Sequence, residues 1–99
     1  MRLTSDQVEL IKSTAKTLLG DGVRVRLFGS RVDDHAKGGD VDLLVEVETP
    51  LGEPAVVSAR MASQISRGMQ GRKVDVVLKA PNLKEQPIHR IALQHGVVL

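Results

Sequence analysis

The chain has 99 residues, one aromatic residue, no cysteine and a formal net charge of +2. A chain of this length buries roughly 65% of its unfolded surface, which suffices for one core and excludes separate cofactor and substrate domains, so we expect a single domain over residues 1–99. The absence of Trp, Tyr and Cys excludes disulfides, thiolate metal sites and an aromatic platform for single-stranded nucleic acid, so no direct nucleic-acid binding is expected.

The N-terminal segment lacks the features of a targeting signal. Met1–Gln7 carries a positive charge without an apolar core behind it, and no stretch of the chain approaches the ~20 apolar residues of a membrane span. The absence of cysteine agrees with a reducing compartment. We therefore expect a cytoplasmic protein without a membrane partner.

The first elements are a helix and a strand. Apolar side chains recur at helical spacing over residues 5–19, with a capping box from Thr4 to Gln7 at the start and Gly20 at the end. Apolar and charged residues then alternate over residues 23–28, which predicts a strand.

The rest of the chain continues the alternation of strands and helices. Residues 31–39 are polar and end in paired glycines, so they form a loop or a short helix. The patterns that follow predict a strand over 41–48, a helix over 57–71, a strand over 72–79 and a helix over 87–95. Strands alternating with helices indicate an α/β fold with a small sheet of three or four strands, covered on one or both faces.

Two aspartates lie where the second predicted strand begins. Asp40 and Asp42 are two residues apart, so their side chains leave the same face of the strand, with Cα atoms roughly 6.5–7 Å apart. Hard cations such as Mg²⁺ prefer carboxylate oxygens, and sites that transfer nucleotidyl groups hold two ions ~3.5–4 Å apart. The pair therefore predicts a two-metal Mg²⁺ site, and the alternative is a pair of solvated aspartates at a strand end.

A Gly-Ser pair at the end of the preceding strand favours the metal interpretation. Gly29 allows the backbone to approach a phosphate, and the Ser30 hydroxyl forms an anion site together with free N–H groups if the following residues turn helical. Gly-Ser alone is a weak signal. The combination is a more specific signal, because Gly-Ser lies at the end of one strand and Asp-x-Asp follows at the start of the next.

These residues resemble a known family, the minimal nucleotidyltransferases of the DNA polymerase beta superfamily. The stretch from Leu27 to Val45 is similar to the family signature of a hydrophobic residue, Gly-Ser, a spacer and Asp-x-Asp among apolar residues. Asp75, on the third predicted strand, matches the third carboxylate of the family. The resemblance covers roughly residues 5–80 and implies a small nucleotidyltransferase fold with a mixed three- or four-stranded sheet and flanking helices.

The resemblance also implies roles for six residues. Three carboxylates hold two Mg²⁺ ions and serve catalysis, the last of them by helping to deprotonate the attacking hydroxyl: Asp40, Asp42 and Asp75. Three residues contact the nucleoside triphosphate, most simply ATP: Gly29, Ser30 and Arg31. The chain departs from many relatives at residues 32–34 and 39, where Val-Asp-Asp and a glycine stand in place of Ala-Arg-Gly and Ser.

Two functions are open from the sequence. The first is Mg²⁺-dependent transfer of AMP, or another nucleoside monophosphate, from a triphosphate to a hydroxyl of a partner protein. The resemblance implies that this partner is a small helical HEPN-type toxin whose antitoxin is this chain, and because the chain has no tyrosine, a tyrosine acceptor must lie on the partner. The alternative is a non-catalytic antitoxin that neutralises a HEPN toxin ribonuclease by direct contact. Antibiotic modification is a third and weaker interpretation.

The other polar residues are interpreted as structural or solvated. His35 lies in the loop over 31–39, and His89 and His95 are too far apart around the last helix to form a joint metal pair. Three basic residues flank the turn before the third strand and are interpreted as solvated, with contact to a phosphate or an acidic partner as the alternative: Arg67, Arg72 and Lys73.

Overall fold

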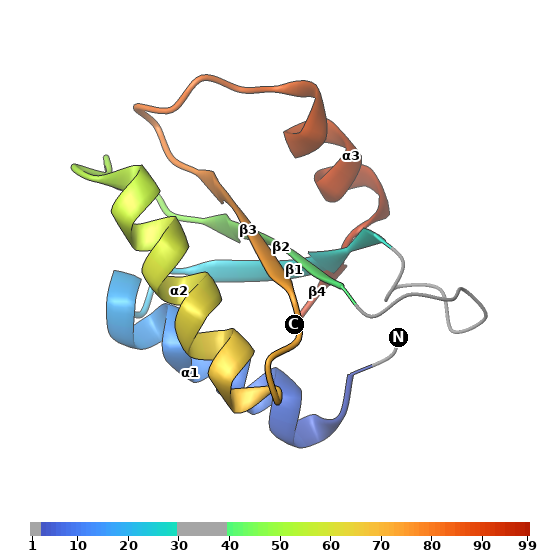
Figure 1. The fold of residues 1–99 in the computed structure, drawn as a ribbon. Coiled ribbons are helices and arrows are strands. Elements are labelled where there is room, and N and C mark those ends of the chain that lie inside the picture. Colours follow the sequence, from blue (N-terminus) through green and yellow to red (C-terminus); the bar gives the residue numbers. More distant parts are fainter. Residues whose placement is uncertain (1–2, 30–39) are drawn as a thin grey trace.

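The computed structural model describes residues 3–29 and 40–99. The elements follow in the order α1 (Ser5–Leu19), β1 (Arg24–Phe28), β2 (Val41–Glu46), α2 (Pro54–Gly68), β3 (Val74–Lys79), α3 (Pro87–His95) and β4 (Val97–Val98) (Figure 1). The predicted helices and strands are confirmed, and β4 adds a short fourth strand. The predicted loop over 31–39 lies outside the described residues.

The boundaries of four elements differ from prediction. The strands predicted over 23–28 and 72–79 are β1 and β3, which begin at Arg24 and Val74. The helix predicted over 57–71 is α2, which begins at Pro54 because proline fits the first helical turn, where its missing N–H is not needed. It ends at Gly68, and a turn that includes Gly71 leads into β3. The strand predicted over 41–48 is β2, which ends at Glu46.

The helix ends follow local chemistry. The Thr4 hydroxyl accepts a hydrogen bond from the Gln7 N–H at 3.1 Å, and the Gln7 side chain accepts one from the Thr4 N–H at 3.0 Å, so the predicted capping box is present. At the other end of α1, the Gly20 N–H donates to the Lys16 carbonyl.

Within the described residues, no helix has both the length and the apolarity needed to cross a membrane.

The four strands form one mixed sheet in the order β3-β2-β1-β4. β1 runs antiparallel to β2 and to β4, whereas β2 and β3 are parallel and are connected through α2. The termini of β2 and β3 that carry Asp42 and Asp75 therefore lie side by side, next to the end of β1.

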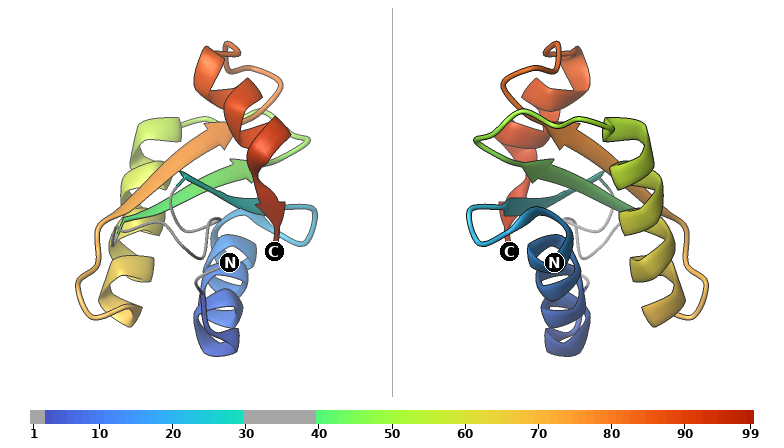
Figure 2. Two further views of the ribbon diagram at one scale, coloured as in Figure 1. Left: turned by 90° about the vertical axis from the view of Figure 1, so that its right-hand side faces the viewer. Right: turned by 90° about the vertical axis from the view of Figure 1, so that its left-hand side faces the viewer.

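Helices cover both faces of the sheet (Figure 2). On one face α1 and α2 pack against each other and against a core of β2 side chains that includes Val41, Leu43 and Val45, all without solvent exposure. On the other face α3 packs on Phe28 and Leu44 through Ala92 and its neighbours. This alternation along β2 places Asp42 on the α3 side of the sheet.

The free edge of β3 is closed by two side chains. The Lys73 carbonyl accepts a hydrogen bond from the Val41 N–H, and the Lys79 carbonyl accepts one from the Val47 N–H. Because successive carbonyls of a strand point in opposite directions, those of Val76 and Leu78 point away from β2. The Ser58 hydroxyl donates to the Val76 carbonyl at 2.9 Å. The ring of His89 contacts the Leu78 carbonyl through Nε2 at 3.0 Å. These bonds occupy two of the carbonyls through which another strand would pair.

His89 is buried, and both of its ring nitrogens have backbone partners. Its Nδ1 accepts from the Gln86 N–H at 2.8 Å, so Nε2 carries the proton donated to Leu78. The structural interpretation of His89 is therefore confirmed, and His95 lies exposed on the same helix.

Replacing His89 with Ala is expected to destabilise the fold by about 2–3 kcal/mol, because the buried Leu78 carbonyl and Gln86 N–H both lose their partner. For a domain of this size the loss corresponds to a fall in Tm of roughly 10–20 °C in thermal unfolding followed by circular dichroism. His95→Ala, at an exposed position of α3, serves as the matched control and should leave Tm nearly unchanged. Equal effects of the two substitutions would contradict the proposed closure of the β3 edge.

Candidate active site

The centre of the candidate site is a pair of carboxylates on adjacent strands. The parallel register aligns Asp42 of β2 directly with Asp75 of β3, and their carboxyl groups are within hydrogen-bonding reach of each other. On the opposite side of β2, the antiparallel register aligns Asp42 with Phe28, the last residue of β1. The structure thus brings together two of the three predicted catalytic carboxylates.

The surroundings of Asp42 disfavour its negative charge. Burial is the main reason that its pKa is raised above the ordinary value of 3.8, followed by the like charges of Asp75 and Asp40 and by the hydrogen bond with Asp75. Lys73 acts in the opposite direction. A positive charge placed nearby would therefore stabilise the ionised form of Asp42.

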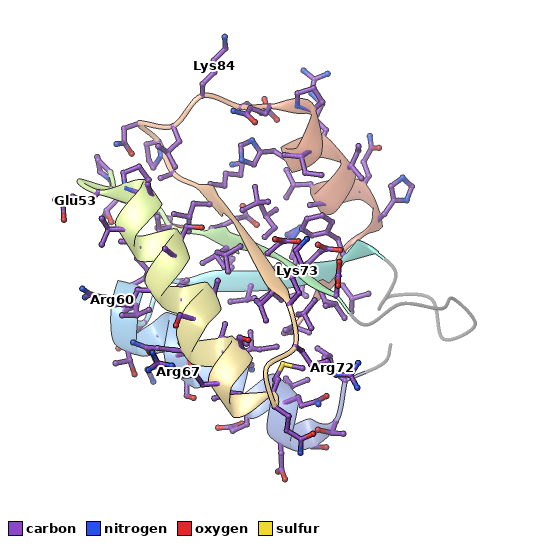
Figure 3. All side chains as sticks on the ribbon, in the orientation of Figure 1. Glu53, Arg60, Arg67, Arg72, Lys73 and Lys84 are labelled. Carbon is purple, nitrogen blue, oxygen red and sulfur yellow. The ribbon has the colours of Figure 1, made fainter. Side chains whose placement is uncertain are left out.

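Asp40, the third predicted carboxylate, directly precedes β2 and belongs to the same cluster. Its Oδ2 lies 4.0 Å from the Nζ of Lys73, which also lies 3.8 Å from Oδ2 of Asp75. The side chains of Asp40 and Asp75 are 56% and 51% exposed, so both are open to solvent and to a ligand. Figure 3 labels Lys73 where the chain enters β3.

Gly29 connects the predicted nucleotide-binding segment to this cluster. It follows β1 with a φ of +77°, in the left-handed region that favours glycine. A Cβ at this position would overlap the carboxylate of Asp42 and lie 3.2 Å from its Cγ. Glycine is therefore required here for two reasons, backbone conformation and close approach. The other two predicted nucleotide-binding residues, Ser30 and Arg31, lie outside the described residues.

The carboxylates are open rather than assembled around an ion. Over residues 3–29 and 40–99, no three His, Cys, Asp or Glu side chains are gathered closely enough to hold a metal ion as they stand. The donor set nevertheless fits a divalent cation, because carboxylate oxygens are the ligands that Mg²⁺ prefers. The electrostatics of the site also favour a cation, because the negative charge of Asp42 is disfavoured and the ammonium of Lys73 already lies beside Asp40 and Asp75. Asp40, Asp42 and Asp75 are the residues that would hold the ion.

Lys73 adds a basic residue to the site. Its side chain is 68% exposed, as a solvated turn predicts, but its ammonium also faces the carboxylates of Asp40 and Asp75. The relevant signal is the spacing, because residues two apart on a strand share a face. Lys73 and Asp75 are so spaced.

Comparison with known families agrees with this arrangement. A family model described as a nucleotidyltransferase domain matches residues 8–99. That match covers every element except the start of α1. Among curated proteins, none matches the chain.

Proposed function

Since the chain belongs to the family of nucleotidyltransferase domains, we propose that it transfers AMP, or another nucleoside monophosphate, from ATP or a related triphosphate to a hydroxyl of a partner protein. The observation that carries the proposal is the alignment of Asp42 with Asp75, beside Asp40 and Gly29. Family membership supports nucleotidyl transfer in general. The acceptor, the nucleotide and the Mg²⁺ dependence are parts of the proposal.

In this mechanism the three carboxylates position the reacting groups. Asp40, Asp42 and Asp75 would hold Mg²⁺, which would supply positive charge to offset the triphosphate and the leaving pyrophosphate. Asp42 lies at the centre of the cluster and keeps its position through the β2–β3 pairing. Gly29 leaves room beside Asp42, and its lack of a side chain allows a phosphate to approach the backbone.

The transfer itself is a substitution at the α-phosphorus. The acceptor hydroxyl oxygen forms a bond to this phosphorus, the bond to the oxygen bridging the α- and β-phosphates breaks, and pyrophosphate leaves with that electron pair. The hydroxyl proton passes to Asp75, whose side chain is half exposed and can return it to solvent. Most of the rate comes from positioning and charge neutralisation.

The acceptor is placed on another molecule. The sequence has no tyrosine, so a tyrosine acceptor must come from a partner. The described part of the chain consists of one sheet and its helices, without a second lobe that would orient an acceptor. We therefore expect the partner to contribute the surface that orients its own hydroxyl. We propose a small helical HEPN-type toxin as this partner and the chain as its antitoxin, on the basis of the resemblance of residues 27–45 to the minimal nucleotidyltransferases. The absence of cysteine supports the proposal of a cytoplasmic location.

The experiment is to purify the chain together with the product of the adjacent open reading frame, which the proposal predicts to be a small helical protein, and to supply ATP radiolabelled at the α-phosphate. We expect label on the partner, dependent on Mg²⁺ and lost in EDTA, and negligible label on this chain incubated alone. Strong labelling of the isolated chain would contradict transfer to a partner. Neutralisation of the toxin without any label, unchanged by the double substitution Asp40→Asn and Asp42→Asn, would instead identify a non-catalytic antitoxin.

A further inference from the structure

Lys73 occupies a fixed position beside the carboxylate cluster. Its carbonyl accepts a hydrogen bond from the Val41 N–H at 2.9 Å, so its backbone is attached to β2 next to Asp40. The preceding turn is also held in place, since the Ser66 hydroxyl donates to the Arg72 carbonyl at 2.6 Å. The root of the Lys73 side chain is therefore set by backbone bonds, and its ammonium reaches two carboxylates from there.

We propose that Lys73 is the built-in counter-cation of this site: its ammonium neutralises the carboxylate cluster in the metal-free protein, and an incoming divalent cation must displace it. The inference rests on the proposed function in one respect, namely that a divalent cation binds Asp40, Asp42 and Asp75. The neutralising role of Lys73 does not depend on that assumption.

The contacts of Lys73 are suited to being broken. Its Nζ lies 4.0 Å and 3.8 Å from the two carboxylates, longer than the roughly 2.7–2.9 Å of a charge-assisted hydrogen bond. The side chain is 68% exposed, so it can move into solvent without opening the core. Such exposed pairs are weak, and a divalent ion competes with them readily.

A second charged cluster on the same face of the sheet shows the contrast. Arg26 Nε lies 3.4 Å from Oε1 of Glu46, with both side chains only 21% exposed, and Lys79 lies 3.9 Å from the other Glu46 oxygen. Arg26 Nε and Glu46 Oε1 are themselves buried. That cluster is therefore fixed by its surroundings, whereas Lys73 is free to exchange.

Displacement gives Lys73 a second role. Because its backbone stays attached to Val41, the released ammonium remains within side-chain reach of the site and can bind a triphosphate as a point charge. Lys73 thus opposes the free metal ion but favours the nucleotide. The two effects have opposite signs, which a purely structural lysine would not produce.

The metal test compares Lys73→Gln with Lys84→Gln in the full chain. Lys84 is an exposed lysine in the segment between β3 and α3, and Figure 3 shows it away from Lys73, so the control makes the same charge change outside the site. In Mn²⁺ titrations followed by electron paramagnetic resonance without nucleotide, Lys73→Gln should bind roughly 3- to 10-fold more tightly than wild type. It should also bind ATP several-fold more weakly in the presence of Mg²⁺, and Lys84→Gln should change neither affinity. Unchanged or weaker Mn²⁺ binding in Lys73→Gln would overturn the displacement.

A metal-free test separates this inference from the proposed function. In EDTA, Lys73→Gln should lower Tm by roughly 2–4 °C, and the same substitution should lower it by at most half as much in an Asp75→Asn background, because one of its two carboxylate partners is gone. Equal losses in both backgrounds would overturn the counter-cation role. Absence of Mn²⁺ binding in both wild type and variant would overturn the displacement of Lys73 and the proposed Mg²⁺ dependence. The comparison of Tm losses in EDTA would still decide whether Lys73 neutralises the carboxylates.

Discussion

Asp42→Asn is expected to reduce nucleotidyl transfer to the partner by about 10³-fold or more while making the metal-free protein more stable. The loss follows because the central carboxylate of the cluster no longer offers a charged ligand to Mg²⁺. In wild type, Mg²⁺ with ATP at tenfold excess over Kd should add about 1.4 kcal/mol of stability, a rise in Tm of roughly 5–10 °C. Differential scanning fluorimetry should show that rise in wild type and not in the variant.

The gain in metal-free stability has a definite pH dependence. Burial and the neighbouring Asp75 and Asp40 raise the pKa of Asp42 in the folded state above 3.8, so the folded protein binds this proton more tightly than the unfolded chain. The charge of Asp42 therefore costs stability at neutral pH, and the cost is lost as pH falls through the raised pKa. With like charges on neighbouring strands costing roughly 0.2–1 kcal/mol, Asn should raise Tm at neutral pH by about 1–6 °C, less in acid.

The control for this prediction is Asp21→Asn, which removes the same charge at an exposed position where the carboxylate pairs with Lys16. It should leave the transfer, the response to Mg²⁺ with ATP and the pH dependence of Tm close to wild type. An Asp42→Asn variant that keeps the ligand-induced rise in Tm would remove this carboxylate from the proposed site.

Gly29→Ala is expected to lower transfer by about 100-fold, because the new methyl group would occupy space taken by the Asp42 carboxylate. A displacement of a reacting group by about 1 Å can cost that much. The φ of +77° adds a backbone penalty of about 1–2 kcal/mol for alanine, so Tm should fall as well. Activity and thermal unfolding are to be measured on the same preparation.

Gly71→Ala separates the two causes. Gly71 has nearly the same φ, +80°, but a Cβ there would meet no atom within 4 Å. The control should therefore lose a similar stability while retaining most of the transfer activity. If Gly29→Ala lost no more activity than Gly71→Ala, the contact with Asp42 would have no functional meaning.

Local patterns in the sequence determined the helices and strands and the part of the site that lies between the end of β1 and the start of β2. Alternation of apolar and polar residues fixes which side chains share a face, and so the sequence predicts the strands, the shared face of Asp40 and Asp42 and the capping box at Thr4. The resemblance carried by Gly-Ser and Asp-x-Asp likewise implies a nucleotidyltransferase, which the family match over residues 8–99 confirms. These features depend on residues close together in the chain.

Tertiary structure decided how the site is completed. The alignment of Asp42 with Asp75 depends on the parallel pairing of two strands joined through α2, and no local pattern specifies that register. The β2–β3 pairing also directs Lys73 to Asp40, and the antiparallel β1–β2 pairing brings Gly29 against Asp42. The closure of the β3 edge by His89 likewise requires α3 to pack beside a strand eleven residues away. Each of these contacts joins segments whose proximity arises only when the sheet forms.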